Sequence, residues 1–185
     1  KIETGKDSLQ ERDYAINDMV VEVTNMIKSK LGAKPVQLVV NIDQNISSKL
    51  NGDSAKLYQS ILNIMTNSVK YTDVGKITLT LTSSKTNNVE NLLFKVSDTG
   101  SGIKQEDYNK LFTKFSRLDN AVEKEIDGSG LGLAITKNYV TLMGGRIWFE
   151  SQYRVGTTFY IEVPQKIVDP KPISEAIKEV KKPKV

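Results

Sequence analysis

Apolar residues recur at helical spacing in three stretches of the chain, and each stretch predicts an amphipathic helix. The three predicted helices cover residues 14–31, 54–71 and 131–143. Gly32 and Pro35 follow the first, and Gly144-Gly145 follow the third, as helix-ending residues do. An acidic or hydroxyl side chain just before the second helix suits an N-cap.

Shorter runs rich in β-branched and aromatic residues predict strands between these helices. The expected strands cover residues 36–42, 76–82, 91–97, 146–151 and 157–163, with a polar hairpin loop over 82–90. Strands collected in pairs, with helices between them, indicate one mixed sheet with helices on one face. The expected fold is therefore an α/β (α+β) two-layer sandwich: a mostly antiparallel sheet of about five strands under three main helices.

The segment from Ile103 to Asp127 has no regular period. Two short apolar groups, Leu111-Phe112 and Phe115, interrupt a charged background. A connection of this length without secondary structure is usually a functional lid or binding loop. We expect it to cover a ligand.

Composition narrows the chemistry that the chain can perform. Its 185 residues include no cysteine and no histidine, so a bound metal would need oxygen ligands, which favours Mg²⁺. It has neither an apolar run of ~18 residues nor a signal-peptide pattern, so we expect a soluble, cytoplasmic domain. The net charge is +4, but residues 164–185 hold six lysines against three acidic residues. A basic face for nucleic acid is therefore not expected on the folded body.

The second predicted helix has a polar face beside its apolar stripe. On a wheel of 100° per residue, its polar side chains fall within a sector of about 100°. They are Asn63, Asn67, Lys70 and Tyr71. Asparagine is a poor helix former, so two asparagines at i and i+4 within a helix indicate function more strongly than a solvated face.

Two glycine-rich segments accompany this face. Asp98 ends the strand that precedes Gly100 and Gly102, and a carboxylate there suits the exocyclic amine of adenine, directly or through water. The segment 127–132 opens the third helix, where bare amides attract phosphate. Each segment alone is weak evidence for a nucleotide site. The first is also compatible with an ordinary turn, and the second fits neither a dinucleotide fingerprint nor a P-loop. Their order with the polar helix points to Mg-ATP.

Together these segments resemble the ATP-binding catalytic domain of sensor histidine kinases, within the group shared with gyrase, Hsp90 and MutL-type ATPases. The N box corresponds to residues 59–71, the G1 box to 98–103 and the G2 box to 128–133. Residues 110–117 match the F box, and 156–159 match the closing strand. The resemblance covers residues 10–163.

The resemblance implies a role for each matching residue. Asn67 should ligate Mg²⁺, supported by Asn63, while Lys70 contacts a phosphate and Asp98 reads adenine. Arg117 resembles the lid arginine that reaches the γ-phosphate, although a solvated lid arginine is the alternative. The implied catalytic residues are Asn63, Lys70 and Arg117. The implied nucleotide-binding residues are Asn67, Lys70, Tyr71, Asp98, Gly100, Gly102, Ile103, Gly128, Ser129, Gly130, Leu131, Gly132 and Thr158.

Asn63 separates the branches of this group. The ATPase members carry a glutamate there that activates water, and an amide cannot act as a general base. The residue favours phosphoryl transfer to another nucleophile over hydrolysis. In the kinases that nucleophile is a histidine on a two-helix dimerisation domain, and this chain has no histidine. A nucleotide-binding scaffold or sensor without transfer, and a GHKL-type ATPase, remain the alternatives.

The ends of the chain suggest flanking parts. We expect residues 1–12 to end an upstream dimerisation segment, 13–164 to form the catalytic domain and 165–185 to be a linker or tail. The last four residues suit either a plain tail or the first strand of a receiver domain, as in hybrid kinases. Phe112 and Phe115 suit either docking on the dimerisation helices or packing in this domain's own core. The expected partners are that dimerisation domain and a response regulator or receiver domain. The isolated domain is expected to be monomeric, without direct contact to membrane.

Overall fold

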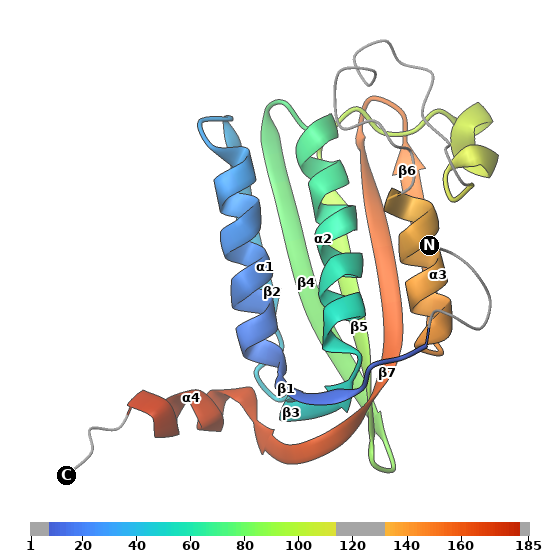
Figure 1. The fold of residues 1–185 in the computed structure, drawn as a ribbon. Coiled ribbons are helices and arrows are strands. Elements are labelled where there is room, and N and C mark those ends of the chain that lie inside the picture. The colour runs from blue at the N-terminus through green and yellow to red at the C-terminus, as the bar shows by residue number, and fades with distance from the viewer. Residues whose placement is uncertain (1–7, 114–131, 182–185) are drawn as a thin grey trace.

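A computed structural model describes residues 8–113 and 132–181 of the chain (Figure 1). Its elements, in chain order, are β1 (Arg12–Ala15), α1 (Ile16–Leu31), β2 (Val36–Ile42), β3 (Ser47–Gly52), α2 (Ser54–Tyr71), β4 (Gly75–Thr86), β5 (Val89–Asp98), the 3₁₀ helix η1 (Gln105–Lys110), α3 (Gly132–Leu142), β6 (Arg146–Gln152), β7 (Gly156–Pro172) and α4 (Ile173–Lys181). Within these residues no helix is both long and apolar enough to cross a lipid bilayer.

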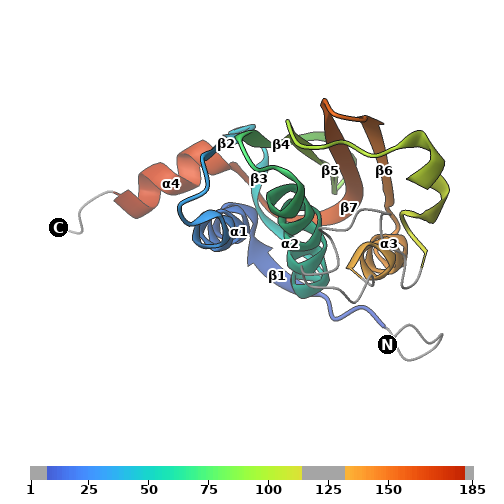
Figure 2. The ribbon, with the colours of Figure 1, turned by 90° about the horizontal axis from the view of Figure 1, so that it is seen from above.

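The strands form one mixed sheet of seven strands in the order β1-β3-β7-β5-β4-β2, with β6 paired to β7. β2 and β4 are parallel, and all the other pairs are antiparallel. β7 is long enough to pair with β6 along its first half and with β3 along its second. Figure 2 shows α1, α2 and α3 side by side on one face of the sheet. The expected two-layer fold is confirmed.

The core lies between these helices and the sheet. Helix α1 buries the apolar stripe expected from the sequence, and Gly32 ends it with a φ of 52° and an N–H bonded to the Lys28 carbonyl. Helix α2 begins after Asp53, whose carboxylate accepts from the Lys56 N–H at 3.0 Å. The strands contribute alternate residues such as Leu79 and Phe94 to the same core.

Two features of the sheet differ from the sequence expectation. It contains seven strands rather than about five, because β1 and β3 were not anticipated. The β3 sequence is made of Ser, Lys, Asn, Gly and one leucine, which resembles a turn; pairing on both sides holds it extended. The expected loop 82–90 is mostly strand, since β4 and β5 continue to a tight turn where Asn87 has a φ of 55°.

The chain beyond the expected end of the domain at Pro164 continues in the sheet. β7 pairs with β3 as far as Pro172, and Ile173 at the start of α4 is buried. Residues 165–172 therefore contribute to this fold. The division of the chain into an upstream segment, a catalytic domain and a tail stays a prediction.

Candidate functional site

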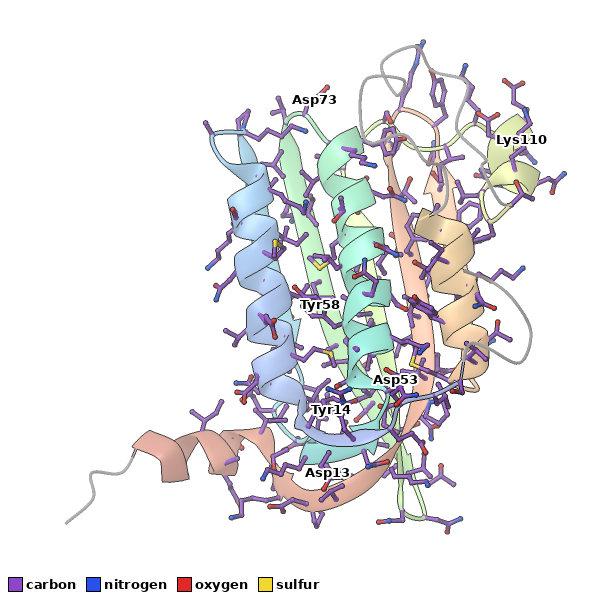
Figure 3. All side chains as sticks on the ribbon, viewed as in Figure 1. Asp13, Tyr14, Asp53, Tyr58, Asp73 and Lys110 are labelled. Atoms are coloured by element: carbon purple, nitrogen blue, oxygen red, sulfur yellow. The ribbon has the colours of Figure 1, made fainter. Side chains whose placement is uncertain are left out.

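The candidate site lies along the C-terminal half of α2. Figure 3 labels a residue just outside each end of this helix: Asp53 before its first turn and Asp73 after its last. The core stripe of α2 buries residues such as Leu57, Ile61 and Ile64. This leaves the half-buried Asn63 and Asn67 on the neighbouring face.

Asn63 lies against the first turn of α3. Its Nδ2 donates to the Gly132 carbonyl at 3.2 Å and to Thr136 Oγ1 at 3.0 Å. Its Oδ1 accepts from Gln59 Nε2 at 2.8 Å. One turn further along, the Asn67 amide has no hydrogen-bond partner among residues 8–113 and 132–181. The two asparagines of this face are thus in different environments.

Asp98 is the last residue of β5 and lies opposite Thr157 of β7. Its side chain is nearly buried; Oδ1 accepts from the Gly100 N–H at 2.9 Å and the Thr157 N–H at 3.3 Å. Burial raises the pKa of Asp98, and hydrogen bonds from Gly100, Ser68 and Thr157 oppose that rise. The two backbone donors, Gly100 and Thr157, join the end of β5 to the glycine segment and to β7. The geometry suits an acceptor placed to meet a donor group of a ligand.

Gly100 and Gly102 are required by the protein's own backbone. A Cβ on Gly100 would lie 2.3 Å from the Tyr71 carbonyl oxygen, and the next residue, Ser101, donates its N–H to that oxygen at 3.0 Å. Gly102 has a φ of 69°, and a Cβ there would lie 2.1 Å from the Gln152 carbonyl oxygen. The first contact places the glycine segment against the last turn of α2, and the second places it against the end of β6. By contrast, a Cβ on Gly132 would meet nothing within 4 Å.

Ile103 ends this segment in the core. It is 6% exposed, and its N–H donates to Ser151 Oγ at 2.8 Å. Ser151 Oγ is also 2.8 Å from Thr157 Oγ1. Ile103 is therefore connected through two hydroxyls to the residue whose N–H bonds Asp98.

Thr158 does not lie at this site, which corrects the expectation. Successive residues of a strand face opposite sides of the sheet. Thr157 pairs with Asp98 and shares its buried, helix-covered face, whereas Thr158 pairs with Ser97 and is 3.0 Å from its hydroxyl on the other face. Thr157, rather than Thr158, is the residue of this strand that lies beside Asp98.

Three residues at the site were not singled out from the sequence: Ser68, Ser151 and Thr157. The alternation of Phe159, Ile161 and Val163 could have identified Thr157, because its position continues that buried series. Ser68 falls among the buried positions of α2, four residues after Ile64, and a polar residue at a core position of a helix is a usable signal. Ser151 had no distinguishing pattern.

Several expected residues lie outside the described part of the chain. They are Arg117, Gly128, Ser129, Gly130 and Leu131, together with Phe115. Phe112 is described and packs against the sheet, with its ring centroid 6.0 Å from that of Phe149 and 6.5 Å from that of Phe159. Phe112 is partly buried against the domain's own core, and its docking on the dimerisation helices stays a prediction.

One side-chain oxygen at the site could serve as a magnesium ligand. Among the described residues no group of three or more Asp, Glu, His or Cys side chains is placed to hold a metal. Mg²⁺ usually keeps several waters and takes one or two protein ligands plus substrate phosphates. The amide oxygen of Asn67, unpaired within the described residues, suits such a site.

Comparison with known proteins is consistent with this geometry. A family model described as histidine kinase-, DNA gyrase B- and HSP90-like ATPase matches residues 52–167. Hybrid signal transduction histidine kinase B of Dictyostelium discoideum is 34% identical over 165 residues, covering 89% of this chain and 8% of that protein. The circadian input-output histidine kinase CikA of Synechococcus elongatus is 33% identical over 178 residues, covering 93% of this chain and 23% of its own.

A solved structure, full-length ShkA in complex with AMPPNP, superposes with a TM-score of 0.75 at 24% identity, covering 89% of this chain and 33% of that one. At this identity the likeness establishes the fold alone. The chain spans less than a quarter of the length of either curated relative.

Proposed function

We propose that this chain, which belongs to the histidine kinase-, DNA gyrase B- and HSP90-like ATPase family, is the ATP-binding catalytic domain of a sensor histidine kinase. In this role it binds Mg-ATP and donates the γ-phosphate to a histidine on a separate dimerisation domain. One observation carries the proposal: Gly132 and the glycine segment that follows Asp98 both contact α2. The Asn63 amide donates to the Gly132 carbonyl, and the Tyr71 carbonyl accepts from the Ser101 N–H.

Each group of this site has a chemical task in nucleotide binding. Asp98 would accept from the exocyclic amine of adenine, because its carboxylate is already fixed by backbone donors. Lys70 and Tyr71, in the last turn of α2, would contact the phosphates and the nucleotide. Asn67 would hold Mg²⁺, which when bound neutralises charge on the phosphate oxygens. Arg117 would add a second cation for the γ-phosphate.

The residues favour transfer over hydrolysis. An amide cannot deprotonate water at neutral pH, and both hydrogens of the Asn63 amide are already donated to α3. In the transfer step the acceptor nitrogen attacks the γ-phosphorus, the bond from phosphorus to the β,γ-bridging oxygen breaks, and ADP leaves. The chain contains no histidine, so the acceptor belongs to another domain.

The parent protein would supply the remaining parts. Relatives such as hybrid signal transduction histidine kinase B are much longer than this chain. We propose that the dimerisation domain lies before residue 12 in the parent sequence. A response regulator or receiver domain would then receive the phosphoryl group after the dimerisation domain. A cytoplasmic location, where ATP is available and thiols are reduced, suits a chain without cysteine.

Calorimetric titration of this chain with ADP, ATP and GTP, each with MgCl₂, tests the nucleotide site. We expect binding of the adenine nucleotides with a Kd of about 1 µM, equivalent to about −8 kcal/mol, and much weaker binding of GTP. Equal affinity for adenine and guanine nucleotides, or no binding of either, would contradict the proposal.

A further inference from the structure

The Asn63 carboxamide has a partner for both of its polar atoms. Its two N–H groups point to the Gly132 carbonyl oxygen and to Thr136 Oγ1, and its oxygen accepts from Gln59 Nε2. Exchanging the amide oxygen and nitrogen would bring two oxygens within 3.2 Å at Gly132. The hydrogen-bond partners therefore define the orientation of this amide.

On α3, the Asn63 amide contacts the side chain of Thr136. This side chain is fully buried, and its hydroxyl donates to the Gly132 carbonyl at 2.8 Å. A hydroxyl has one hydrogen, so toward Asn63 it can only accept. The Gly132 carbonyl in turn accepts from both residues. These bonds connect α2 to the first turn of α3, the two helices that lie side by side in Figures 1 and 2.

Asn67 lies one turn along the same face, yet no described residue hydrogen-bonds its amide. Its oxygen is thus available in a way that the Asn63 oxygen, occupied by Gln59, is not. Asn63 and Asn67, four residues apart on one helix, therefore have different hydrogen-bond environments. The two asparagines should respond differently to magnesium.

We propose that Gln59 and Thr136 are positioning residues that commit Asn63 to fastening α2 to α3. The contribution of Asn63 to nucleotide binding is then independent of magnesium, whereas that of Asn67 depends on it. This assignment rests on the proposed nucleotide site, and it replaces the expectation that Asn63 supports the metal. It also explains why an amide, with two donors and an acceptor, suits position 63: a carboxylate would face the Gly132 carbonyl without a hydrogen.

The test measures ADP binding by calorimetry in MgCl₂ and in EDTA for the full chain and its variants. Thr136→Val and Asn63→Ala should each weaken binding roughly 3- to 10-fold in both media, the range expected for a lost hydrogen bond. Thr136→Ser should restore near-normal affinity because it keeps the hydroxyl. Asn67→Ala should weaken binding in MgCl₂ only. Thr141→Val, at an exposed threonine of the same helix, is the matched control and should change nothing.

A double-mutant cycle separates the fastening role from simple packing. If Thr136 acts through Asn63, adding Thr136→Val to Asn63→Ala should change the ADP affinity by less than about 2-fold and the Tm no further. Gln59→Glu should lower the Tm, because a carboxylate cannot donate to the Asn63 oxygen and repels it. Gln59→Glu should have no such effect in the Asn63→Ala background.

Three results would overturn the assignment: additive effects of the two substitutions, no rescue by Thr136→Ser, or a loss in Asn63→Ala confined to MgCl₂. If the unmodified chain binds no ADP, the proposed function fails instead. The Tm cycle then still decides whether Asn63 fastens the two helices, since non-additive losses support it and additive losses refute it.

Discussion

Replacing Asp98 by asparagine should separate ligand recognition from folding. Asparagine has nearly the same shape, and its Oδ1 can still accept from the N–H groups of Gly100 and Thr157. The second carboxylate oxygen becomes an NH₂ group, which would face the exocyclic amine of adenine donor to donor. A hydrogen bond to a charged acceptor contributes about 1.5–3 kcal/mol. Adenine nucleotide affinity should therefore fall roughly 10- to 150-fold.

The same substitution should not destabilise the fold at neutral pH. Burial raises the pKa of Asp98 above its ordinary value of 3.8, so the folded state holds this proton more tightly than the unfolded state. Such a group stabilises the fold below the ordinary pKa, and that stabilisation is lost as pH rises through the folded-state pKa. Asp98→Asn removes this pH-dependent cost. Its free energy of unfolding at pH 7 should equal or exceed that of the unmodified chain.

Calorimetry with two ligands provides the assay for this prediction. One ligand is ADP, and the other is purine riboside diphosphate, in which hydrogen replaces the 6-amino group. The unmodified chain should prefer ADP, and Asp98→Asn should lose that preference, since its effect acts through the amino group. The reasoning is refuted if the variant weakens both ligands equally, or if it retains the preference for ADP.

Further predictions follow from other contacts. Gly100→Ala should lower the free energy of unfolding by about 1–3 kcal/mol, because its Cβ would lie 2.3 Å from the Tyr71 carbonyl oxygen. Gly132→Ala has open space around its Cβ and should change the free energy of unfolding by less than about 1 kcal/mol. Denaturant titration measures both values. Burial opposes ionisation of Asp53, but hydrogen bonds from Gln10 and Lys56 outweigh it and lower its pKa. Its stabilisation is present above the ordinary pKa and lost as pH falls through the folded-state pKa, so the stability gap to Asp53→Asn should shrink below about pH 4. The purified chain should hydrolyse ATP far more slowly than ~1 s⁻¹, and a fast, partner-independent rate would contradict the interpretation of Asn63.

The helical layer was predictable because its signals are local. The apolar stripe of α1 and the acidic cap of α2 are visible in a few residues, and the observed bounds agree with the expected ones to within a few residues. The polar face of α2 was equally readable, because asparagine is unusual within a helix. The structure places both asparagines on one half-buried face, as expected.

The remaining features depend on long-range pairing. β3 has a turn-like composition and is a strand because β1 and β7 pair with its two sides. Thr157, rather than Thr158, lies beside Asp98 because of strand register, which a shift of one residue reverses. Gly100 was expected among the nucleotide-binding residues, and in the fold a Cβ on it would meet the Tyr71 carbonyl of α2. These features depend on which strands and helices pack together in the folded protein, and a short stretch of sequence does not specify that.

The central claim is that this domain holds ATP for a histidine located elsewhere. The direct measurement mixes the chain with the separately prepared dimerisation domain of its parent, γ-labelled ATP and MgCl₂. We predict acid-labile label on the histidine of that domain and none on this chain. Binding of Mg-ATP without any label on the dimerisation domain would contradict the claim and indicate a nucleotide-binding module that transfers nothing.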